Sequence, residues 1–499
     1  MDRAYEGAGA VGEAQYHHEF IPGMDLRRYR MSDAGNAELL VALYGEALRY
    51  DHREGVWYVW VAPHWQRDDR GMVQRLAVAA ARWREGQLDG LDADQLGRRA
   101  RAAQAAWALR SENSGRVGAA LRVAATERAL ALRGDEWDRD PWLLGVSNGV
   151  VDLRTGELRA TVPGDLTRLH SKVAYDPEAE CPRWQQFLEE VFGGNEEMAG
   201  FVARAVGYTL TGVRDEDVWF LLQGNGCNGK RTFVRTLREV LGGYALDVAF
   251  RRVLRGWWGL GQGVVGLLEG RRLVTVVGAP EGRIVSAPAL DALGRDREHW
   301  LRTGGRRAVS VHPVAKLWMA VDGHARLGDS GGGVLGRCRV IPFEQAFEGD
   351  RADRGLAEQL RGEAAGILRW AVEGCRAWQE QGLGVPSSVS EATGAWCEDE
   401  DPYGSFLATV SAREPGRFVT TDEMYEAYDL WCFDMEIEGR PKKIAFGRAM
   451  SERLENGRHP ETRKRGYKNV KLIKEWYWRV HRWDPLDPDF DPAELDRYE

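Results

Sequence analysis

The strongest constraint on the fold comes from residues 217–236, DVWFLLQGNGCNGKRTFVRT, where three patterns follow one another directly. An apolar run from Val218 to Leu222 stands between charged residues and glycine, which is typical of a strand buried on both faces of a parallel sheet. A glycine-rich turn follows, and a helix-forming run extends from Lys230 to about Leu241. This order predicts a loop whose backbone N–H groups, together with the helix N-terminus, face a phosphate.

The turn matches the phosphate-loop pattern G-x-x-x-x-G-K-[S/T] except at its last position. Arg231 stands where a hydroxyl would hold magnesium, and Thr232 comes one helical residue later, turned by about 100°. An ordinary glycine-rich loop is the alternative. For Arg231 two roles stay open: its guanidinium replaces part of the metal's charge, or it points to solvent. The expected ligand is ATP or another NTP, with Mg²⁺ in doubt, and the expected contacts are Gly224, Asn225, Gly226, Cys227, Asn228, Gly229, Lys230, Arg231 and Thr232.

The loop Gly-x-Gly-x-Asn-Gly-Lys resembles that of the superfamily-three helicases in phage and plasmid primase-helicases, which belong to the AAA+ ATPases. Segments 148–158, 181–184 and 205–212 resemble the part that precedes the helicase domain, and segments 313–318 and 337–343 resemble its later motifs. The similarity extends from about Ala34 to Trp478. It implies an ATP-driven DNA helicase that forms a ring. No stretch is left over for the primase module of longer relatives, so a separate primase is an expected partner.

The expected fold class is α/β, with an AAA+ type P-loop domain around a central parallel sheet. The expected division is a flexible tail (1–33), a mainly helical α+β collar domain (34–205), the P-loop domain (206–385), a winged-helix domain (386–483) and an acidic tail (484–499). Segment 71–132 is expected to form several helices, and 259–270 a flexible glycine-rich stretch. Helices are also expected at 36–50, 182–191, 196–210, 392–396, 402–410, 421–432 and 445–454, strands at 56–60, 271–277, 317–321 and 470–480, and a hairpin at 150–160.

Three further positions are candidates for catalysis, and the sequence departs from the resembled family at or beside each of them. After the second strand, where the family has a group of acids, Glu281 is the acid that remains. Asp322 follows the third strand, where the family uses asparagine to sense the terminal phosphate, and a carboxylate there repels it. The family has an arginine pair that reaches into the neighbouring subunit's site, and at this place Gly336 removes one arginine while Arg337 remains. The scaffold residues are kept while the residues that would touch metal, water and phosphate are altered.

Two basic regions are candidates for DNA contact, because phosphates attract such clusters without regard to sequence. Arg302, Arg306 and Arg307 flank Thr303-Gly304-Gly305, where a hairpin is expected. The resemblance implies that this hairpin enters a central channel and holds single-stranded DNA. From Arg440 to Arg482 there are 14 Lys/Arg and 4 Asp/Glu, against 7 acids and one Arg from Asp484 onward. A solvated face is the alternative for both regions. The expected duplex contacts at the winged helix are Arg448, Arg463, Lys464, Arg465, Lys468 and Lys471.

Composition excludes several classes of protein. The 43% hydrophobic and 29% charged residues are ordinary for a globular chain, and 499 residues suffice for two to four domains. No apolar run approaches a membrane span, and the start lacks an apolar signal core, so a cytoplasmic protein without membrane contact is expected. The six cysteines form no Cys-x-x-Cys pair, and the ten histidines have no ligand spacing, so no metal site is expected.

Two functions fit these patterns. One is a ring-forming ATP-dependent DNA helicase of phage or plasmid replication, with Lys230 on the phosphates, Glu281 serving metal or water, and Arg337 acting between subunits. The other is a homologue without turnover, which acts as a DNA-binding, accessory or interfering protein of a mobile element. The resemblance favours the first as an ancestry, and the altered residues favour the second.

Overall fold

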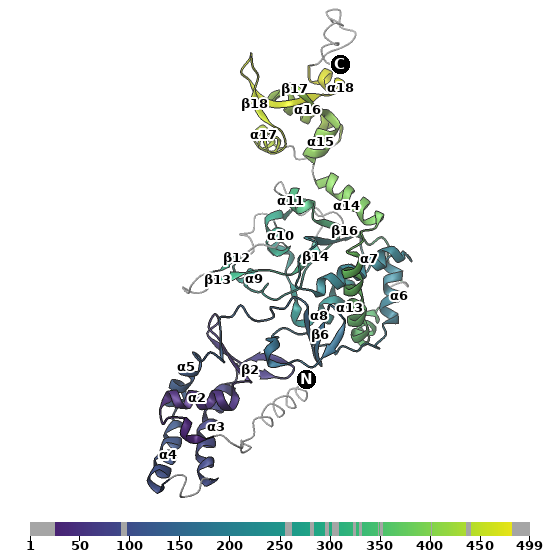
Figure 1. The fold of residues 1–499 in the computed structure, drawn as a ribbon. Coiled ribbons are helices and arrows are strands. Elements are labelled where there is room, and N and C mark those ends of the chain that lie inside the picture. Colours follow the sequence, from purple (N-terminus) through teal and green to yellow (C-terminus); the bar gives the residue numbers. More distant parts are fainter. Residues whose placement is uncertain are drawn as a thin grey trace, which may run out of the picture.

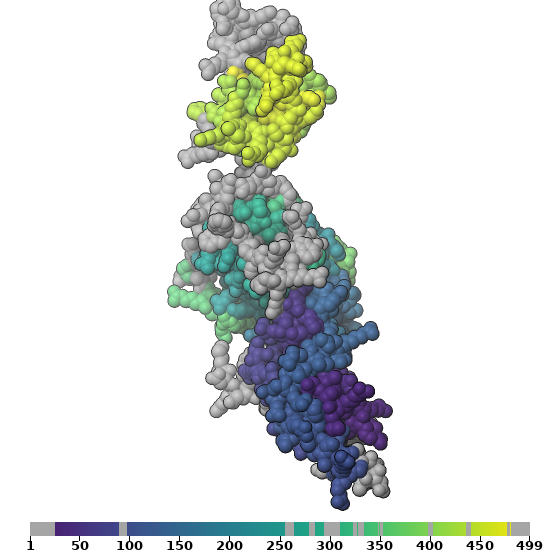
Figure 2. Space-filling model, turned by 90° about the vertical axis from the view of Figure 1, so that its left-hand side faces the viewer, coloured from purple at the N-terminus to yellow at the C-terminus, as the bar shows by residue number. Residues whose placement is uncertain are grey.

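The computed structural model of this chain describes residues 25–90, 97–254, 262–279, 284–294, 299–301, 309–322, 326–328, 332–347, 349, 353–400, 402–435 and 441–481. Three units follow one another along an elongated molecule (Figure 1). The N-terminal unit lies at one end, a unit built on a parallel sheet lies in the middle, and a small C-terminal unit lies at the other end. Figure 2 shows the same order from a second direction.

The N-terminal unit packs helices against a sheet of order β3-β2-β1-β4. The strand expected at 56–60 is confirmed, whereas the helix expected at 36–50 ends at Tyr44. Leu48–Asp51 forms a strand instead and pairs with Val56–Val59. This pairing gives the backbone N–H and C=O groups of the segment hydrogen-bond partners that a helix would otherwise have supplied. The elements are η1 (Leu26–Arg28), α2 (Asp33–Tyr44), β1 (Leu48–Asp51), β2 (Val56–Val61), β3 (His64–Arg67), α3 (Met72–Gly86), η2 (Gln87–Gly90), α4 (Arg98–Ser111), α5 (Ser114–Ala124) and β4 (Ala131–Leu132).

The flexible tail expected at 1–33 is wrong for its last part. Leu26 is only 3% exposed and belongs to the core of the N-terminal unit. The carbonyl oxygen of Tyr29 accepts a hydrogen bond of 3.1 Å from the buried side chain of Arg84 on α3. Residues 25–33 are therefore part of the packed unit. Ser32 caps the start of α2, because its hydroxyl accepts a hydrogen bond from the Gly35 N–H.

A small antiparallel sheet and two helices lead into the middle unit. The expected hairpin at 150–160 and the helices at 182–191 and 196–210 are confirmed. Helix α7 packs closely on α13 because both carry glycine at the crossing: a Cβ at Gly207 would lie 2.0 Å from the Cys375 nitrogen, and one at Gly374 would lie 2.1 Å from the Ala203 oxygen. The elements are β5 (Leu143–Val146), β6 (Gly149–Asp152), β7 (Glu157–Arg159), η3 (Pro163–Asp165), α6 (Pro182–Val191), α7 (Glu196–Leu210) and α13 (Ala364–Gln381).

The middle unit is built on a five-stranded sheet of order β16-β8-β14-β10-β9, in which all neighbouring strands are parallel. Phe220 and Leu222 of β8 enter the core on one face of the sheet, and Trp219 and Leu221 enter the core on the other. The expected α/β class with a central parallel sheet is therefore confirmed, as is the burial of the first strand on both faces. The strands are β8 (Trp219–Gly224), β9 (Ala245–Asp247), β10 (Leu273–Ala279), β14 (Lys316–Asp322) and β16 (Cys338–Pro342).

Helices and short strands surround this sheet. The stretch 259–270, expected to be flexible, contains a short helix in its described part, and Leu268 within it is fully buried. An antiparallel pair, β12 and β13, flanks residues 302–308, which lie outside the described residues. The elements are α8 (Lys230–Leu241), η4 (Gly242–Tyr244), η5 (Phe250–Arg252), α9 (Gln262–Gly266), β11 (Ile284–Ser286), α10 (Ala287–Gly294), β12 (His299–Leu301), β13 (Val309–Val311), β15 (Arg326–Gly328), α11 (Gly332–Leu335) and α12 (Leu356–Gly362).

The C-terminal unit has a three-stranded sheet of order β17-β19-β18, and its helices share one core with this sheet. The strand expected at 470–480 is wrong beyond Leu472, because Trp476 and Val480 both enter the core four residues apart, which is the spacing of a helix. Helix α14 (Ser387–Glu400) packs on β16, with the Val340 N–H donating to the Thr393 hydroxyl at 2.9 Å, and its Val389 and Trp396 enter the cores of the middle unit. The C-terminal unit, expected to begin at 386, therefore begins after α14. Its elements are α15 (Pro402–Val410), β17 (Ser411–Thr420), α16 (Thr421–Asp434), α17 (Lys443–Ser451), β18 (Asn456–Arg458), β19 (Arg465–Leu472) and α18 (Lys474–His481).

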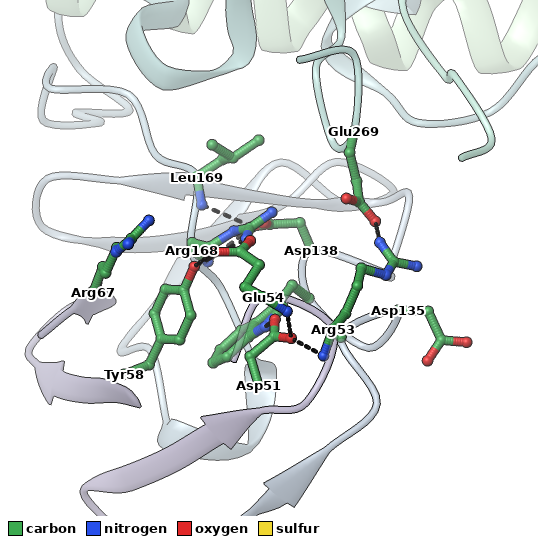
Figure 3. Close-up of polar contacts among 12 residues, drawn as sticks. Asp51, Arg53, Glu54, Tyr58, Arg67, Asp135, Asp138, Arg168, Leu169 and Glu269 are labelled. Carbon is green, nitrogen blue, oxygen red and sulfur yellow. Dashed lines mark hydrogen bonds and ion pairs between the residues drawn. The ribbon is translucent and has the colours of Figure 1, made fainter. Parts of the chain in front are cut away.

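A polar cluster joins the N-terminal sheet to the middle unit (Figure 3). Arg168 donates to Glu54 at 2.8 Å, and its backbone N–H donates to Asp138 at 2.8 Å. Arg53 pairs with Glu269, which lies just before β10 of the middle unit. Burial raises the pKa of Asp138, although the nearby Arg168 charge opposes this. These contacts connect β1 and β2 to the chain that leads into the parallel sheet.

Candidate nucleotide-binding site

The glycine-rich turn occupies the end of β8, and helix α8 begins at Lys230 as expected. Each glycine is needed for its own reason. A Cβ at Gly224 would lie 2.2 Å from the carbonyl oxygen of Phe343, and one at Gly229 would lie 2.7 Å from Val191. Gly226 and Gly229 also have positive φ, at 72° and 90°, which residues with a side chain rarely adopt. The turn is thus fixed against β16 and α6 rather than open.

Lys230 is folded back over the turn and almost fully buried, with only 2% of its side chain exposed. Its Nζ donates to the carbonyl oxygen of Gly224 and to Oδ1 of Asn228, each at 2.7 Å. Asn228 in turn donates from Nδ2 to the carbonyl oxygen of Phe343 at 2.9 Å. Burial lowers the pKa of the Lys230 ammonium, and the nearby carboxylate of Asp322 offsets part of that effect.

Asp322 is brought to this loop by the order of the sheet. It is the last residue of β14 and pairs in register with Gly224 at the end of β8. Its Oδ1 lies 3.4 Å from Nζ of Lys230, and its Oδ2 lies 2.6 Å from Nη2 of Arg231. Arg231 is 68% exposed yet paired with Asp322, so a purely solvated side chain does not describe it. One carboxylate therefore engages the two cations that a phosphate would need.

A cavity of about 880 Å³ lies in front of the loop. Of the nine expected contact residues, those from Gly226 to Thr232 line it. No side chain in the described chain caps the first turn of α8, and the residues of that turn, Lys230, Arg231 and Thr232, line this space. The remaining lining residues were not expected from the sequence: Arg183, Gln186, Phe187, Glu190, Asp322, Phe347, Asp353 and Leu356.

Helix α6 supplies the opposite wall of the cavity. Arg183 pairs with Glu190 at 3.4 Å and with Asp353 at 3.3 Å, and only 16% of its side chain is exposed. The backbone N–H of Phe347 donates to the carbonyl oxygen of Cys227 at 2.7 Å, which holds the segment after β16 against the loop. The sequence carried one clue to this wall, since Arg183 lies in the Cys-Pro-Arg-Trp segment that resembles the helicase-proximal region.

Arg337, a further catalytic candidate, is not among the residues that line the cavity. Arg337 is bound within its own chain, by Asp217 at 3.2 Å and by Asp291, so contact with another subunit would require it to leave these partners. Glu281 and the channel candidates Arg302, Arg306 and Arg307 lie outside the described residues.

The basic residues of the C-terminal unit are divided between paired and exposed positions. Lys468 pairs with Glu455 at 3.2 Å, and Lys471 pairs with Glu414 at 2.7 Å. The other expected residues are exposed: Arg448 on α17, Arg463 and Lys464 in the turn between β18 and β19, and Arg465 at the start of β19.

A groove of about 740 Å³ separates α17 from the β18–β19 hairpin. Arg465 lines it together with two basic residues that the sequence analysis missed, Arg458 and Lys443. Arg458 and Arg465 are directly opposite each other on the two strands. Like charges in this position destabilise a hairpin unless an anion lies near them. The groove therefore has the charge to accept a phosphate backbone.

A magnesium ion does not fit the described residues of the cavity. Arg231 replaces the hydroxyl ligand, and Asp322 is already engaged by two cations. Within the described chain, no group of three or more His, Cys, Asp or Glu side chains is arranged to hold a metal. In the same part of the chain, none of the helices combines the length and apolar composition that a membrane crossing needs.

Comparisons with known proteins point to viral relatives. Residues 37–193 match the family described as "D5 N terminal like". "Putative helicase L207/L206" of Acanthamoeba polyphaga mimivirus is 27% identical over 336 residues, covering 59% of this chain and 33% of the viral protein. "Putative helicase 022R" of Frog virus 3 (isolate Goorha) is 23% identical over 280 residues, covering 51% of this chain and 29% of that protein. The chain thus spans about a third of the length of these relatives.

Solved structures of the C-terminal region of NrS-1 are also similar to this chain, at 10% identity. The A form of the apo structure covers 74% of this chain and 75% of its own chain with a TM-score of 0.45. A further apo structure covers 87% and 99% with a TM-score of 0.42.

Proposed function

We propose that this protein is a nucleotide-binding, helicase-like protein of viral or phage DNA replication. The observation that carries the proposal is the loop at the end of β8: a buried lysine, two glycines at positive φ and an uncapped helix N-terminus face a cavity of about 880 Å³. This is the arrangement that binds phosphate in P-loop proteins. The strand order β16-β8-β14-β10-β9, with the loop strand inside the sheet, supports assignment to the AAA+ type and to superfamily three.

DNA is the second proposed ligand, bound by the C-terminal unit as a winged helix. The order α15-β17-α16-α17-β18-β19 supports this assignment, because it places a helix beside a two-stranded wing. In this arrangement α17 enters the major groove, and the basic groove beside it takes the backbone. The same proposal includes residues 302–308 as a channel loop and assembly into a ring, in which Arg337 acts between subunits.

A homologue without turnover is the second candidate function. The specific observation that favours it is the contact of Arg231 with Asp322, since these side chains stand where helicases of the resembled family position metal and terminal phosphate. Loss of each such group typically raises the activation barrier by several kcal/mol and so lowers turnover. In that case the protein binds nucleotide and DNA and acts as an accessory or interfering partner of an active replication protein.

Nucleotide binding is tested by titrating fluorescent ATP into the full chain and into Lys230→Met, which keeps the volume of the buried side chain. Arg235→Ser is the matched control, because Arg235 lies on the same helix and pairs with Glu239 at 2.9 Å, away from the cavity. The Met variant should lose binding while the control keeps it. Equal affinity in all three folded proteins would refute the proposal. Magnesium-dependent ATPase with single-stranded DNA, compared between wild type and Lys230→Ala, then separates the helicase from the homologue without turnover.

DNA binding is tested separately by fluorescence anisotropy with duplex DNA over a range of salt concentrations. Replacing both Arg458 and Arg465 by Ser should weaken binding and reduce the salt slope by about 2, because two phosphate contacts are removed. Arg413→Ser in the same unit is the control, since Arg413 lies on β17 and donates to the carbonyl oxygen of Arg453. An unchanged salt slope in the double variant would show that the groove does not take the DNA backbone.

A further inference from the structure

We infer that the cavity binds a nucleotide polyphosphate without a divalent cation, and that Arg231 is the counter-ion in the metal's place. The inference rests on the proposed nucleotide site and specifies its ligand as the metal-free nucleotide. In an ordinary P-loop, the hydroxyl after the lysine binds Mg²⁺, which bridges the phosphates. Here a guanidinium follows Lys230, and a guanidinium donates hydrogen bonds to phosphate but cannot coordinate a metal.

The carboxylates of the cavity leave little room for a metal. Three of its described lining residues are acids, and each is already paired with a cation. Glu190 and Asp353 pair with Arg183 on the α6 wall. Asp322 pairs with Lys230 and Arg231 at the loop. A divalent cation bound to Asp322 would lie beside these two positive charges, which repel it.

The contact of Asp322 with Lys230 and Arg231 indicates how a polyphosphate would bind in the cavity. Asp322 presents one oxygen to Lys230 and the other to Arg231, as two oxygens of a phosphate group would. A phosphate that displaces the carboxylate gains both cations and the N-terminus of α8. Asp322 is 37% exposed, so its side chain can turn toward solvent when the anion arrives. Binding is therefore an exchange of one anion for another at the same two cations.

The exchange also predicts the effect of magnesium. Mg²⁺ removes charge from the nucleotide, so the complex offers less attraction to Lys230 and Arg231 than the free nucleotide does. The wild-type chain should therefore bind ATP and ADP at least as tightly in EDTA as in Mg²⁺. This is the opposite of a site in which a hydroxyl and acids hold the metal.

The test measures the dissociation constants of ATP and ADP by calorimetry, in EDTA and in Mg²⁺ at equal ionic strength, with the full chain. Wild type should show no gain in affinity with Mg²⁺. Arg231→Ser, which restores the hydroxyl, should bind on the order of tenfold more weakly in EDTA and become tighter with Mg²⁺. Arg235→Ser, with its side chain one turn further along α8, should behave as wild type.

The possible results separate this inference from the proposed function. Tenfold or greater tightening of the wild type by Mg²⁺, lost in Asp322→Asn, would identify Asp322 as a metal ligand and overturn the inference alone. No binding in either buffer by a protein with an unchanged melting temperature would overturn the nucleotide site and this inference together. Metal-independent binding that Arg231→Ser does not weaken would show that another group supplies the charge, and would also overturn it.

Discussion

Replacing Asp322 by Asn should tighten nucleotide binding, because the carboxylate competes with phosphate for both cations of the loop. The substitution removes one negative charge and keeps the shape of the side chain. The amide oxygen can still accept from Lys230, and Lys230 keeps its bonds of 2.7 Å to Gly224 and Asn228. The fold of the loop should therefore survive, and the change in affinity should report on electrostatics.

The size of the gain follows from the two distances. At 3.4 Å and 2.6 Å, the carboxylate attracts the two cations by roughly 5–6 kcal/mol each at an effective dielectric constant of about 20. Arg231 is 68% exposed, so solvent reduces its share to about 1 kcal/mol or less, while the share of the buried Lys230 is larger. A net advantage of about 1–2 kcal/mol for the incoming phosphate corresponds to a dissociation constant roughly 5- to 30-fold lower.

The assay is calorimetric titration of ATP into wild type and variant in EDTA, with the melting temperature of each recorded beforehand. Asp217→Asn is the matched control, because Asp217 also pairs with an arginine in the same unit but lies outside the cavity lining. The control should keep the wild-type affinity. If Asp322→Asn binds ATP as weakly as wild type or more weakly, the carboxylate is not a competitor, and the exchange mechanism is refuted.

Three further outcomes are expected. Gly224→Ala should unfold the loop and lower stability by about 2–4 kcal/mol in chemical denaturation, because its Cβ would lie 2.2 Å from the Phe343 oxygen. Burial, with the neighbouring His170 charge, lowers the pKa of His64 to about 4 from 6.5, so stability is full above pH 6.5 and is lost as pH falls toward 4. His64→Gln should therefore lose less stability than wild type across that window, by roughly 1–2 kcal/mol after allowance for partial exposure, in urea titrations at pH 7 and pH 4.5. Arg458→Ser alone should weaken duplex DNA binding equally for unrelated sequences, measured by anisotropy, since a phosphate contact carries no base information.

The sequence predicted those parts of the fold whose patterns are local. The run before Gly224 specified a doubly buried strand, and the start of α8 at Lys230 was placed to the residue. Errors arose where tertiary pairing decided the conformation, as at Leu48–Asp51, where pairing with β2 replaced a helix. The wall formed by Arg183 could not be derived, because it depends on how α6 packs against the loop.

The contact between Arg231 and Asp322 shows why a motif compared position by position misleads here. From the sequence, Arg231 removes a metal ligand and Asp322 places a repelling charge near phosphate, so each substitution alone damages the site. The residues are 91 positions apart, and only the pairing of β14 with β8 brings Asp322 beside Gly224. Once they meet, each charge neutralises the other at 2.6 Å, and the loop keeps a net positive charge from Lys230. In the proposed site the two departures act together, because an ion pair stands where the resembled family holds a metal.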